Sequence, residues 1–534
     1  MGNCHRRVFQ KEPCPYEQIC CSRAKYLDAA FDPVHADVNL TELDRQAEKV
    51  KPQQYEFSFE NIVLEGGGNK GLAYCGAIRV LEEVGIWSQV KRIAGTSCGA
   101  MTATLLAVGY NSHEIQTFLS QDLSSVFLDH VCGACSIPLN VKLGYGWNPG
   151  RKILQWFKKK IKNKTKNEDI TFKMLYESKE TTFIKELCII VTNINEMSAE
   201  YCHVKTFPHM KIVEAVRMSM SLPGVYQAFQ YKHNGIVDIK VDGGILCNYP
   251  IHCFDGWWLS MEEGNSFMER LHPLKELPDF YQHSKRFGEF DNKTLGFVLF
   301  SEHEQDVFRF ELEKRFYMPL EDLSGTVLSD KYHKKKEEAR RAENEHGKLV
   351  KAVEHFLQSV RKHNSDEDRS TIVKTELINA LDDKEAFPTS DRQLIFGDVD
   401  NGLIMQYLDL NDDGKIDYHE LVAFVEEAGV QIRSRVLGYQ RKDVNGVLDF
   451  MSSLISTVIA NAKKAGFKKS DLVRTVAINT GHVCTFDFVL EDEDRAFVVE
   501  RGRQATLTFL KYYVVNNKLP KKTSRDRPTT NTRL

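Results

Sequence analysis

Two glycine-rich turns that follow one another closely place the strongest constraint on this chain. The first, Gly66 to Gly71 (GGGNKG), links an apolar run to residues at helical spacing. The second, Gly95 to Gly99 (GTSCG), links another short apolar run to a helix of small residues. We therefore expect two consecutive strand–turn–helix units between Asn61 and Leu106, as in a layered α/β fold.

The second turn has the pattern G-x-S-x-G, in which a serine lies on a sharp strand-to-helix bend with its hydroxyl exposed. Gly95 and Gly99 are expected there because a Cβ atom would clash with the neighbouring backbone. The helix N-terminus beside Ser97 would also favour developing negative charge. This turn predicts a nucleophilic serine.

The first turn allows two interpretations. Three consecutive glycines present backbone amides that can bind an oxyanion or a phosphate. Gly66, Gly68 and Gly71 also satisfy the dinucleotide pattern G-x-G-x-x-G, which requires an acidic residue roughly 20 residues later. No Asp or Glu occurs between Glu83 and Glu114, and the P-loop spacing is absent, so an oxyanion site is favoured.

A third motif, Val241 to Gly244 (VDGG), follows the stretch EAVRMSMSLPGVYQAF and precedes Asn248-Tyr249-Pro250. In kind and order, the three motifs resemble those of the patatin-like phospholipase family. The resemblance implies a catalytic dyad of Ser97 and Asp242, with Asp242 as general base. It also implies oxyanion and motif-supporting residues, which are Gly66, Gly67, Gly68 and Cys98, and Lys70, Gly71, Gly95, Gly99, Gly243 and Gly244. Cys98 stands where the family usually has Ala or Ser.

Three alternatives stay open at this point. His252 follows the aspartate, as the α/β-hydrolase order requires, and would complete a Ser-His-Asp triad. A triacylglycerol lipase of the same fold is the second alternative. The third is a calcium-dependent membrane-binding scaffold on an inactive lipase fold, which the intact Ser97 and Asp242 disfavour.

The resemblance is interrupted and then resumes, so we expect an insertion. The predicted fold is a three-layer patatin-like α/β sheet with an all-α insertion carrying a pair of EF-hands. The patatin-like parts are 58–321 and 443–515, and the insertion is 322–442. An N-terminal extension (1–57) and a basic tail (516–534) flank them.

The insertion contains a twelve-residue stretch, Asp409 to Glu420, that resembles an EF-hand calcium loop. Its predicted ligands are Asp409, Asn411, Asp413, Asp417 and Glu420, with the backbone carbonyl of Lys415, and Gly414 makes the sharp turn. An upstream stretch, 365–376, aligns with Ile372 and Glu376 in place but has Arg369 and Ser370 at a ligand and a turn position. We expect one bound calcium, in the second hand, and no cofactor for the hydrolysis itself.

Composition and the chain ends bear on location. The chain is 42% hydrophobic and 27% charged, with thirteen cysteines and no apolar run of 18 residues, which favours a cytoplasmic protein without a spanning helix. Gly2 and Cys4 resemble acylation signals, although Arg6 departs from the myristoylation pattern. Thr532 to Leu534 is typical of a PDZ-domain ligand.

We therefore expect peripheral association with a membrane or lipid-droplet surface, and no nucleic-acid partner. Four apolar residues downstream of the aspartate motif have two interpretations, an interfacial patch or ordinary core; they are Trp257, Trp258, Leu259 and Phe267.

Overall fold

The computed structural model describes residues 41–120, 129, 145–233, 235–270, 274–280, 282–288, 290–302, 312, 315–316, 323–364, 371–427, 444–487 and 489–522. The acylation candidates Gly2 and Cys4 and the terminal Thr532 to Leu534 lie outside these residues. The chain folds as two compact units, and each is described by itself. The larger comprises His35–Asp330 and Val444–Leu534, and the smaller comprises Met1–Val34 and Lys331–Asp443.

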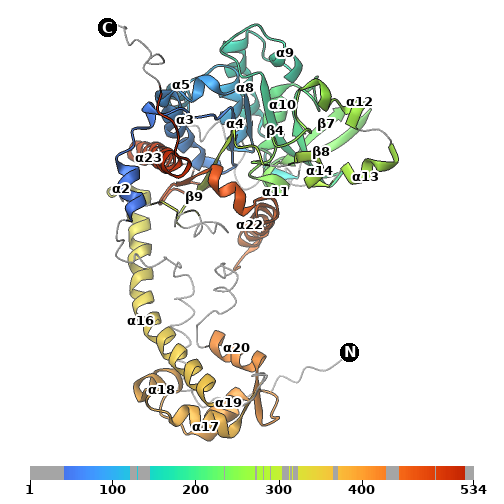
Figure 1. Cartoon of the computed structure of the whole chain (residues 1–534). Helices are drawn as coiled ribbons and strands as arrows, with labels where there is room; N and C mark the ends of the chain where they lie inside the picture. Colours follow the sequence, from blue (N-terminus) through green and yellow to red (C-terminus); the bar gives the residue numbers. More distant parts are fainter. Residues whose placement is uncertain are drawn as a thin grey trace. The chain divides into compact units, whose positions relative to one another are not determined.

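A mixed sheet forms the centre of the larger unit (Figure 1). Its strand order is β12-β9-β1-β2-β4-β8-β7, and β5 pairs with β4. The five strands from β12 to β4 are parallel, whereas β5, β8 and β7 join antiparallel. The strands are β1 (Asn61–Leu64), β2 (Arg92–Gly95), β4 (Glu186–Asn193), β5 (Ser198–Cys202), β7 (Phe229–His233), β8 (Ile236–Asp242), β9 (Thr294–Phe300) and β12 (Thr475–Asn479).

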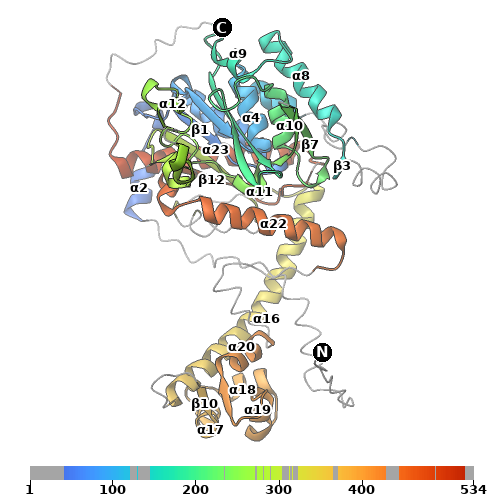
Figure 2. The same cartoon turned by 90° about the vertical axis from the view of Figure 1, so that its right-hand side faces the viewer.

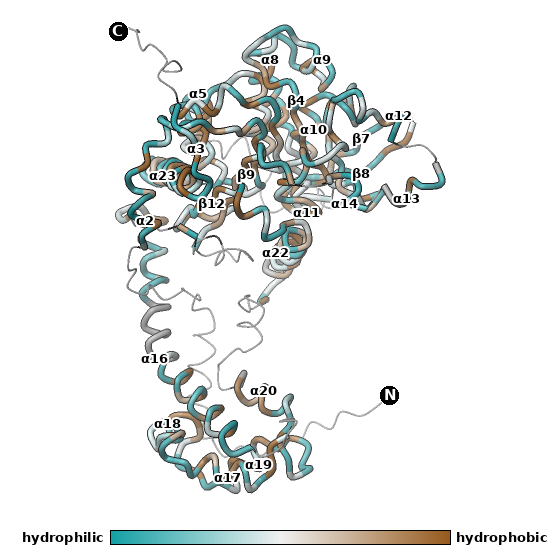
Figure 3. The backbone as a smooth tube through the Cα atoms, viewed as in Figure 1, coloured by the Kyte–Doolittle hydropathy of each residue, from teal (hydrophilic) through white to brown (hydrophobic). Residues whose placement is uncertain are grey.

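The parallel strands read as apolar runs because both of their faces are covered. Ile62 and Leu64 of β1 belong to one hydrophobic core, while Val63 belongs to a second core on the opposite face. Ile189 and Ile190 of β4 divide in the same way. The hydropathy colouring of Figure 3 shows hydrophobic residues through the region of the sheet. The unit is therefore an α/β fold with a covered central sheet.

Helices cover the face of the sheet that carries Ile62 and Leu64. Residues between Tyr249 and Leu259 pack on the face that carries Val63. The helices of this unit are α2 (Glu42–Glu48), α3 (Ala73–Val84), α4 (Cys98–Ala107), α5 (Ser112–Leu119), α8 (Arg151–Thr165), α9 (Phe172–Tyr176), α10 (Ile212–Ser219), α11 (Gly244–Cys247), α12 (Phe267–Arg270), α13 (Leu277–Phe280), α14 (His283–Phe287), α22 (Val447–Gly466) and α23 (Asp492–Asn517). Short strands β3 (Gly146–Asn148) and β6 (Gly224–Tyr226) pair apart from the main sheet. Figure 2 shows α22 beside α11.

Strand β12 and helix α23 follow the smaller unit in sequence, yet both belong to the larger unit. β12 pairs with β9, and Val476 lies opposite Phe297. α23 crosses α3 so closely that a Cβ atom on Gly502 would lie 1.9 Å from the carbonyl oxygen of Ala73. The domain is thus completed by residues on both sides of the insertion.

The smaller unit has a hydrophobic core of its own, which includes Phe356, Phe387, Phe396 and Phe424. Its elements are α16 (Val327–His363, which begins in the larger unit), β10 (Thr371–Val373), α17 (Lys374–Asp382), α18 (Thr389–Phe396), α19 (Asn401–Leu408), β11 (Lys415–Asp417) and α20 (Tyr418–Glu427). β10 and β11 pair antiparallel, with Ile372 opposite Ile416. The unit is therefore helical with one short ladder, rather than entirely helical.

Two expectations about membrane contact can be compared with this fold. Among the described residues, no helix is long and apolar enough to cross a bilayer. Trp257 and Leu259 are buried, while Trp258 and Phe267 are half-buried, and Lys205 lies over the rings of Trp257 and Phe267. This aromatic cluster is packed into the domain and does not form an exposed interfacial patch.

Candidate active site

The pairing of β1 with β2 brings the two glycine-rich turns together. The strands are parallel and adjacent, with Leu64 opposite Gly95, so both turns leave the same edge of the sheet. A Cβ atom on Gly66 would lie 3.1 Å from the Cβ atom of Ser97. The first turn and the predicted nucleophile are therefore direct neighbours.

Ser97 occupies a strained strand-to-helix turn between β2 and α4. Its φ of 53° and ψ of −122° are unusual for a residue with a side chain. A Cβ atom on Gly95 would lie 2.3 Å from the carbonyl carbon of Gly99. A Cβ atom on Gly99 would lie 2.4 Å from the carbonyl oxygen of Leu64. The close approach therefore requires both glycines, for the reason inferred from the sequence. The Ser97 amide donates to the Ser219 hydroxyl at 2.9 Å.

Asp242 ends strand β8, and its carboxyl group accepts a hydrogen bond from the Gly244 amide at 2.7 Å and lies beside the Ser97 hydroxyl. The side chain is buried, and this burial raises the pKa of Asp242 to about 7, although the Gly244 amide and the Ser97 hydroxyl act in the opposite direction. Gly243 is needed beside it, because a Cβ atom there would lie 2.3 Å from the carbonyl oxygen of Ile190. The structure thus places Ser97 and Asp242 side by side.

The predicted oxyanion donors are not equivalent. The Gly66 amide donates to the carbonyl of Asn248 at 3.1 Å, so it already has a partner within the protein. The Gly67 amide donates to the Cys98 thiol at 3.0 Å. Within the described residues, the amides of Gly68 and Cys98 have no hydrogen-bond partner. The Cys98 side chain therefore contacts the first glycine turn, which its motif does not predict.

A buried carboxylate that the sequence interpretation missed anchors the glycine turn. Glu65 accepts a hydrogen bond from the Leu299 amide at 2.8 Å and forms an ion pair with Lys463 of α22 at 2.8 Å. Asn248 donates to Glu65 at 3.3 Å and to the Gly66 carbonyl at 3.0 Å. A charged residue at the end of an apolar strand was the available signal for Glu65, but nothing local identified Lys463. The motif residue Lys70 is also buried and donates to the Leu299 carbonyl at 3.3 Å.

His252 does not complete a triad. Its Nε2 atom is 2.7 Å from the hydroxyl of Tyr201, and its ring packs on His283 and Phe287. Burial holds the pKa of His252 well below its usual value, so the ring is neutral. The described contacts of the Asp242 carboxyl group are with Ser97 and Gly244 instead.

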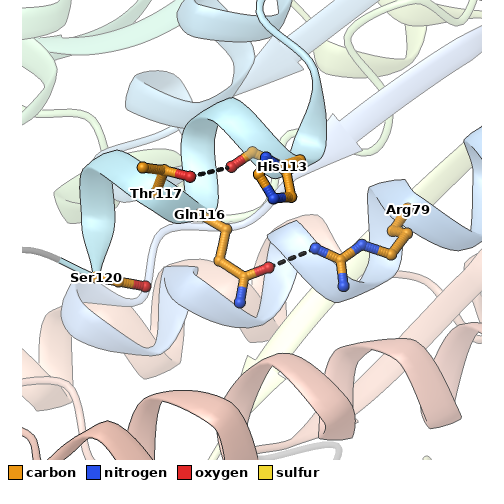
Figure 4. Close-up of a pocket in the computed structure, with 5 residues that line it drawn as sticks. All are labelled: Arg79, His113, Gln116, Thr117 and Ser120. Carbon is orange, nitrogen blue, oxygen red and sulfur yellow. Dashed lines mark hydrogen bonds between the residues drawn. The ribbon is translucent and has the colours of Figure 1, made fainter.

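A surface hollow of about 540 Å³ lies away from these residues, between α3 and α5 (Figure 4). It is open and lined by Arg79, His113, Gln116, Thr117 and Ser120. None of the residues predicted to act in catalysis lines it. The chemistry of the site therefore does not lie in this hollow.

The predicted calcium loop lies in the smaller unit, between α19 and α20. Gly414 has a φ of 78°, in the left-handed region that favours glycine. Glu420 is buried and accepts hydrogen bonds from the amides of Leu410 at 2.8 Å and Asp417 at 2.9 Å. Asp409 accepts from the Gly414 amide at 2.9 Å. The loop side chains thus bond to the backbone of their own loop.

The donor chemistry of this loop fits calcium, because every predicted ligand atom is an oxygen. Among the described residues, no group of three or more His, Cys, Asp or Glu side chains is gathered closely enough to hold a metal ion. Calcium binding would require Glu420 to exchange its bonds to loop amides for the ion. In the upstream stretch, Glu376 accepts from the Val373 amide at 3.1 Å, and Ser365, Arg369 and Ser370 lie outside the described residues.

The covered α/β sheet thus carries a serine on a strained turn, with a buried aspartate beside it. Residues 62–255 match the family described as Patatin-like phospholipase. This part of the chain is therefore similar to patatin-like phospholipases.

The similar proteins align over the same region. The chain is 30% identical to "Uncharacterized protein R571" of Acanthamoeba polyphaga mimivirus over 202 residues, 38% of this chain and 63% of that protein. It is 30% identical to "Uncharacterized protein YqhO" of Bacillus subtilis over 195 residues, 36% and 65% of the two lengths. "Probable lipid hydrolase 463L" of Invertebrate iridescent virus 6 is 25% identical over 204 residues, 38% and 64%. The chain thus spans just under two thirds of the length of these curated relatives.

Among solved structures, VipD from Legionella pneumophila aligns with 85% of this chain and 67% of its own, at 16% identity and a TM-score of 0.37. At that TM-score the likeness has no weight in the assignment.

The Glu65–Lys463 pair generates a stability prediction. Lys463→Met should leave a buried carboxylate without its cation, which typically costs about 3–5 kcal/mol. Urea unfolding should therefore show a lower free energy of unfolding for this variant. The double variant Glu65→Gln/Lys463→Met should recover much of the loss, because no charge then remains buried. A Lys463→Met chain as stable as the parent would contradict the structural role of the pair.

Proposed function

We propose that this chain is a lipid acyl hydrolase of the phospholipase A type, which cleaves ester-linked fatty acids. The observation that carries the proposal is the strained turn that holds Ser97 beside the buried Asp242 carboxyl group. It lies within the region that matches the patatin-like family. The name of one relative, a probable lipid hydrolase, supports a lipid as the substrate class.

Hydrolysis would proceed in two halves, each using Asp242 as the base. Ionised Asp242 takes the proton of Ser97 as the serine oxygen attacks the ester carbonyl, and the alcohol leaves with that proton. Asp242 then takes a proton from the water that attacks the acyl-serine, and it returns this proton to the Ser97 oxygen as the fatty acid leaves. The amides of Gly68 and Cys98 would hold the oxyanion, joined by Gly67 once its amide leaves the Cys98 thiol. The N-terminus of α4 adds a favourable field.

Two other functions fit parts of the same chain. A triacylglycerol lipase would use the same dyad on a neutral lipid. A calcium-dependent membrane-binding scaffold would need no dyad, and the preserved contact between Ser97 and Asp242 supports an enzyme instead. Fatty-acid release from a panel of phospholipids and neutral lipids separates the three.

Ser97→Ala and Asp242→Asn should each reduce ester hydrolysis by about 10⁴-fold or more, because the two residues act as one unit. Fatty-acid release from mixed lipid vesicles measures the loss, and circular dichroism checks that each variant is folded. His252→Ala is the matched control, since His252 bonds Tyr201 rather than Asp242. Near-normal turnover in the Asp242 variant would eliminate the dyad.

The dyad also predicts a pH dependence. Asp242 must be ionised to accept a proton, and its pKa is raised to about 7 by burial. Hydrolysis, measured as kcat/KM on an uncharged ester, should therefore rise with pH through about 7 and level off above it. A rate that already levels off near the ordinary carboxyl pKa of 3.8 would contradict the assignment of Asp242 as the base.

The proposal extends to calcium as a modulator of this hydrolase, through the loop Asp409–Glu420. The supporting observations are its all-oxygen donor set, the left-handed turn at Gly414, and the ladder that joins β11 to β10. A bound ion would offset the mutual repulsion of the loop carboxylates. Because Glu420 lies at the start of α20, engaging it would alter the position of that helix.

Titration calorimetry should find one calcium per chain, and Glu420→Gln should abolish that binding because it removes the bidentate ligand. Hydrolysis and vesicle binding should then respond to calcium in the parent chain and not in the variant. A suitable control is Glu376→Gln, which alters the corresponding position of the upstream stretch and should leave the calcium stoichiometry unchanged. Identical activity of parent and Glu420→Gln at every calcium concentration would refute modulation, even if the ion binds.

A further inference from the structure

Helix α22 exposes a row of large apolar side chains. Phe450, Leu454 and Val458 are 54%, 46% and 37% exposed, and their spacing of four residues places them on one face. Met451, next to Phe450, is also 37% exposed. Contiguous apolar surface of this kind on a folded domain usually marks an interaction site.

The helix that carries this face lies next to the catalytic turns. α22 packs against α11, the short helix that follows Asp242 (Figures 1 and 2). Near its C-terminal end, Lys463 forms the buried ion pair with Glu65, the residue before the glycine turn. The apolar face therefore belongs to an element that is joined to both halves of the site.

Further apolar residues are exposed on the loops around the same site. Leu246 of α11 is 39% exposed. A third segment contacts the first glycine turn, because the Thr485 carbonyl accepts a hydrogen bond from the Asn69 amide. Phe486 and Val489, close to Thr485 in sequence, are 50% and 83% exposed. Three segments that adjoin the catalytic turns thus carry exposed apolar side chains.

The exposed charges at the C-terminal border of α22 are basic, whereas Glu491 and Asp492 are exposed beside Val489. Lys464, Lys468 and Lys469 are exposed at the C-terminal end of α22 and just after it, whereas the nearby Asp471 is buried. This arrangement complements an anionic surface. A helix with an apolar face and basic residues at its border is typical of segments that lie in the interface of a lipid bilayer.

We propose that the α22 face, defined as Phe450, Met451, Leu454 and Val458, docks the chain on the surface of an anionic lipid bilayer. The proposal rests on the proposed function, because a bilayer is where ester-linked fatty acids occur. Docking through α22 together with Leu246, Phe486 and Val489 would bring the catalytic turns to the boundary between headgroups and acyl chains. It also specifies the partner of the site as a membrane rather than a dispersed ester.

The test measures binding without hydrolysis, in a Ser97→Ala chain mixed with phosphatidylcholine vesicles that contain or lack phosphatidylserine. Leu454→Asp/Val458→Asp should lower the partition coefficient on anionic vesicles at least tenfold. The matched control is Met174→Asp/Tyr176→Asp on α9, whose side chains are 51% and 37% exposed on a distant part of the same unit (Figures 1 and 2). It should bind as the parent does. Neutralising Lys464 and Lys468 with Gln should reduce binding to anionic vesicles by roughly fivefold for each lysine.

A second measurement uses the catalytically intact chain. The ratio of vesicle hydrolysis to cleavage of a monomeric short-chain ester should fall at least tenfold in Leu454→Asp/Val458→Asp and should not change in the α9 control. Equal vesicle binding by parent and α22 variant would overturn the proposal. A dimer in sedimentation velocity that the α22 variant dissociates would also overturn it, by assigning the face to a second copy.

These outcomes are separable from the proposed function. A chain that binds vesicles through α22 but releases no fatty acid would refute the hydrolase and leave the docking face standing. A chain that hydrolyses a monomeric ester but binds vesicles independently of α22 would refute the docking face and leave the hydrolase standing.

Discussion

The parallel pairing of β1 with β2 is the constraint on which the site depends. Because Leu64 lies opposite Gly95, the two glycine-rich turns leave the sheet side by side. Their backbones then approach so closely that a Cβ atom on Gly95 or Gly99 would clash, and Ser97 is held at a positive φ. Strain at a single serine is tolerated because packed strands on both sides fix the turn. The position of the proposed nucleophile thus follows from strand register.

Two buried carboxyl groups near this turn differ in how well their charge is compensated. Glu65 has a lysine partner and a backbone donor, so its charge can anchor the glycine turn. Asp242 has an amide and a serine hydroxyl but no cation among its described contacts, so burial raises its pKa to about 7. The first group is suited to structure and the second to proton transfer near neutral pH. Lys463 also joins the segment after the insertion to the glycine turn, which places part of the site's support on that segment.

The sequence predicted what short motifs can encode. The α/β class, the two strand–turn–helix units and the need for Gly95 and Gly99 follow from local patterns, and the structure shows each of them. The motif does not predict that the Gly66 amide bonds a carbonyl far along the chain, on Asn248. The pair of Glu65 with Lys463 could not be anticipated for the same reason. Contacts between residues far apart in the sequence leave no periodic signal. The burial of Trp257 and Trp258 likewise depends on tertiary packing.

The central claim is that Ser97, activated by Asp242, forms the acyl intermediate. Its most direct test is mass spectrometry of the full chain after reaction with a long-chain alkyl fluorophosphonate, which bonds covalently to activated serines. The account predicts one adduct, mapped to the peptide that contains Ser97, with a labelling rate that rises as Asp242 ionises through a pH of about 7. A chain that hydrolyses lipid esters while its adduct maps to another residue, or while Ser97 stays unlabelled, would contradict it.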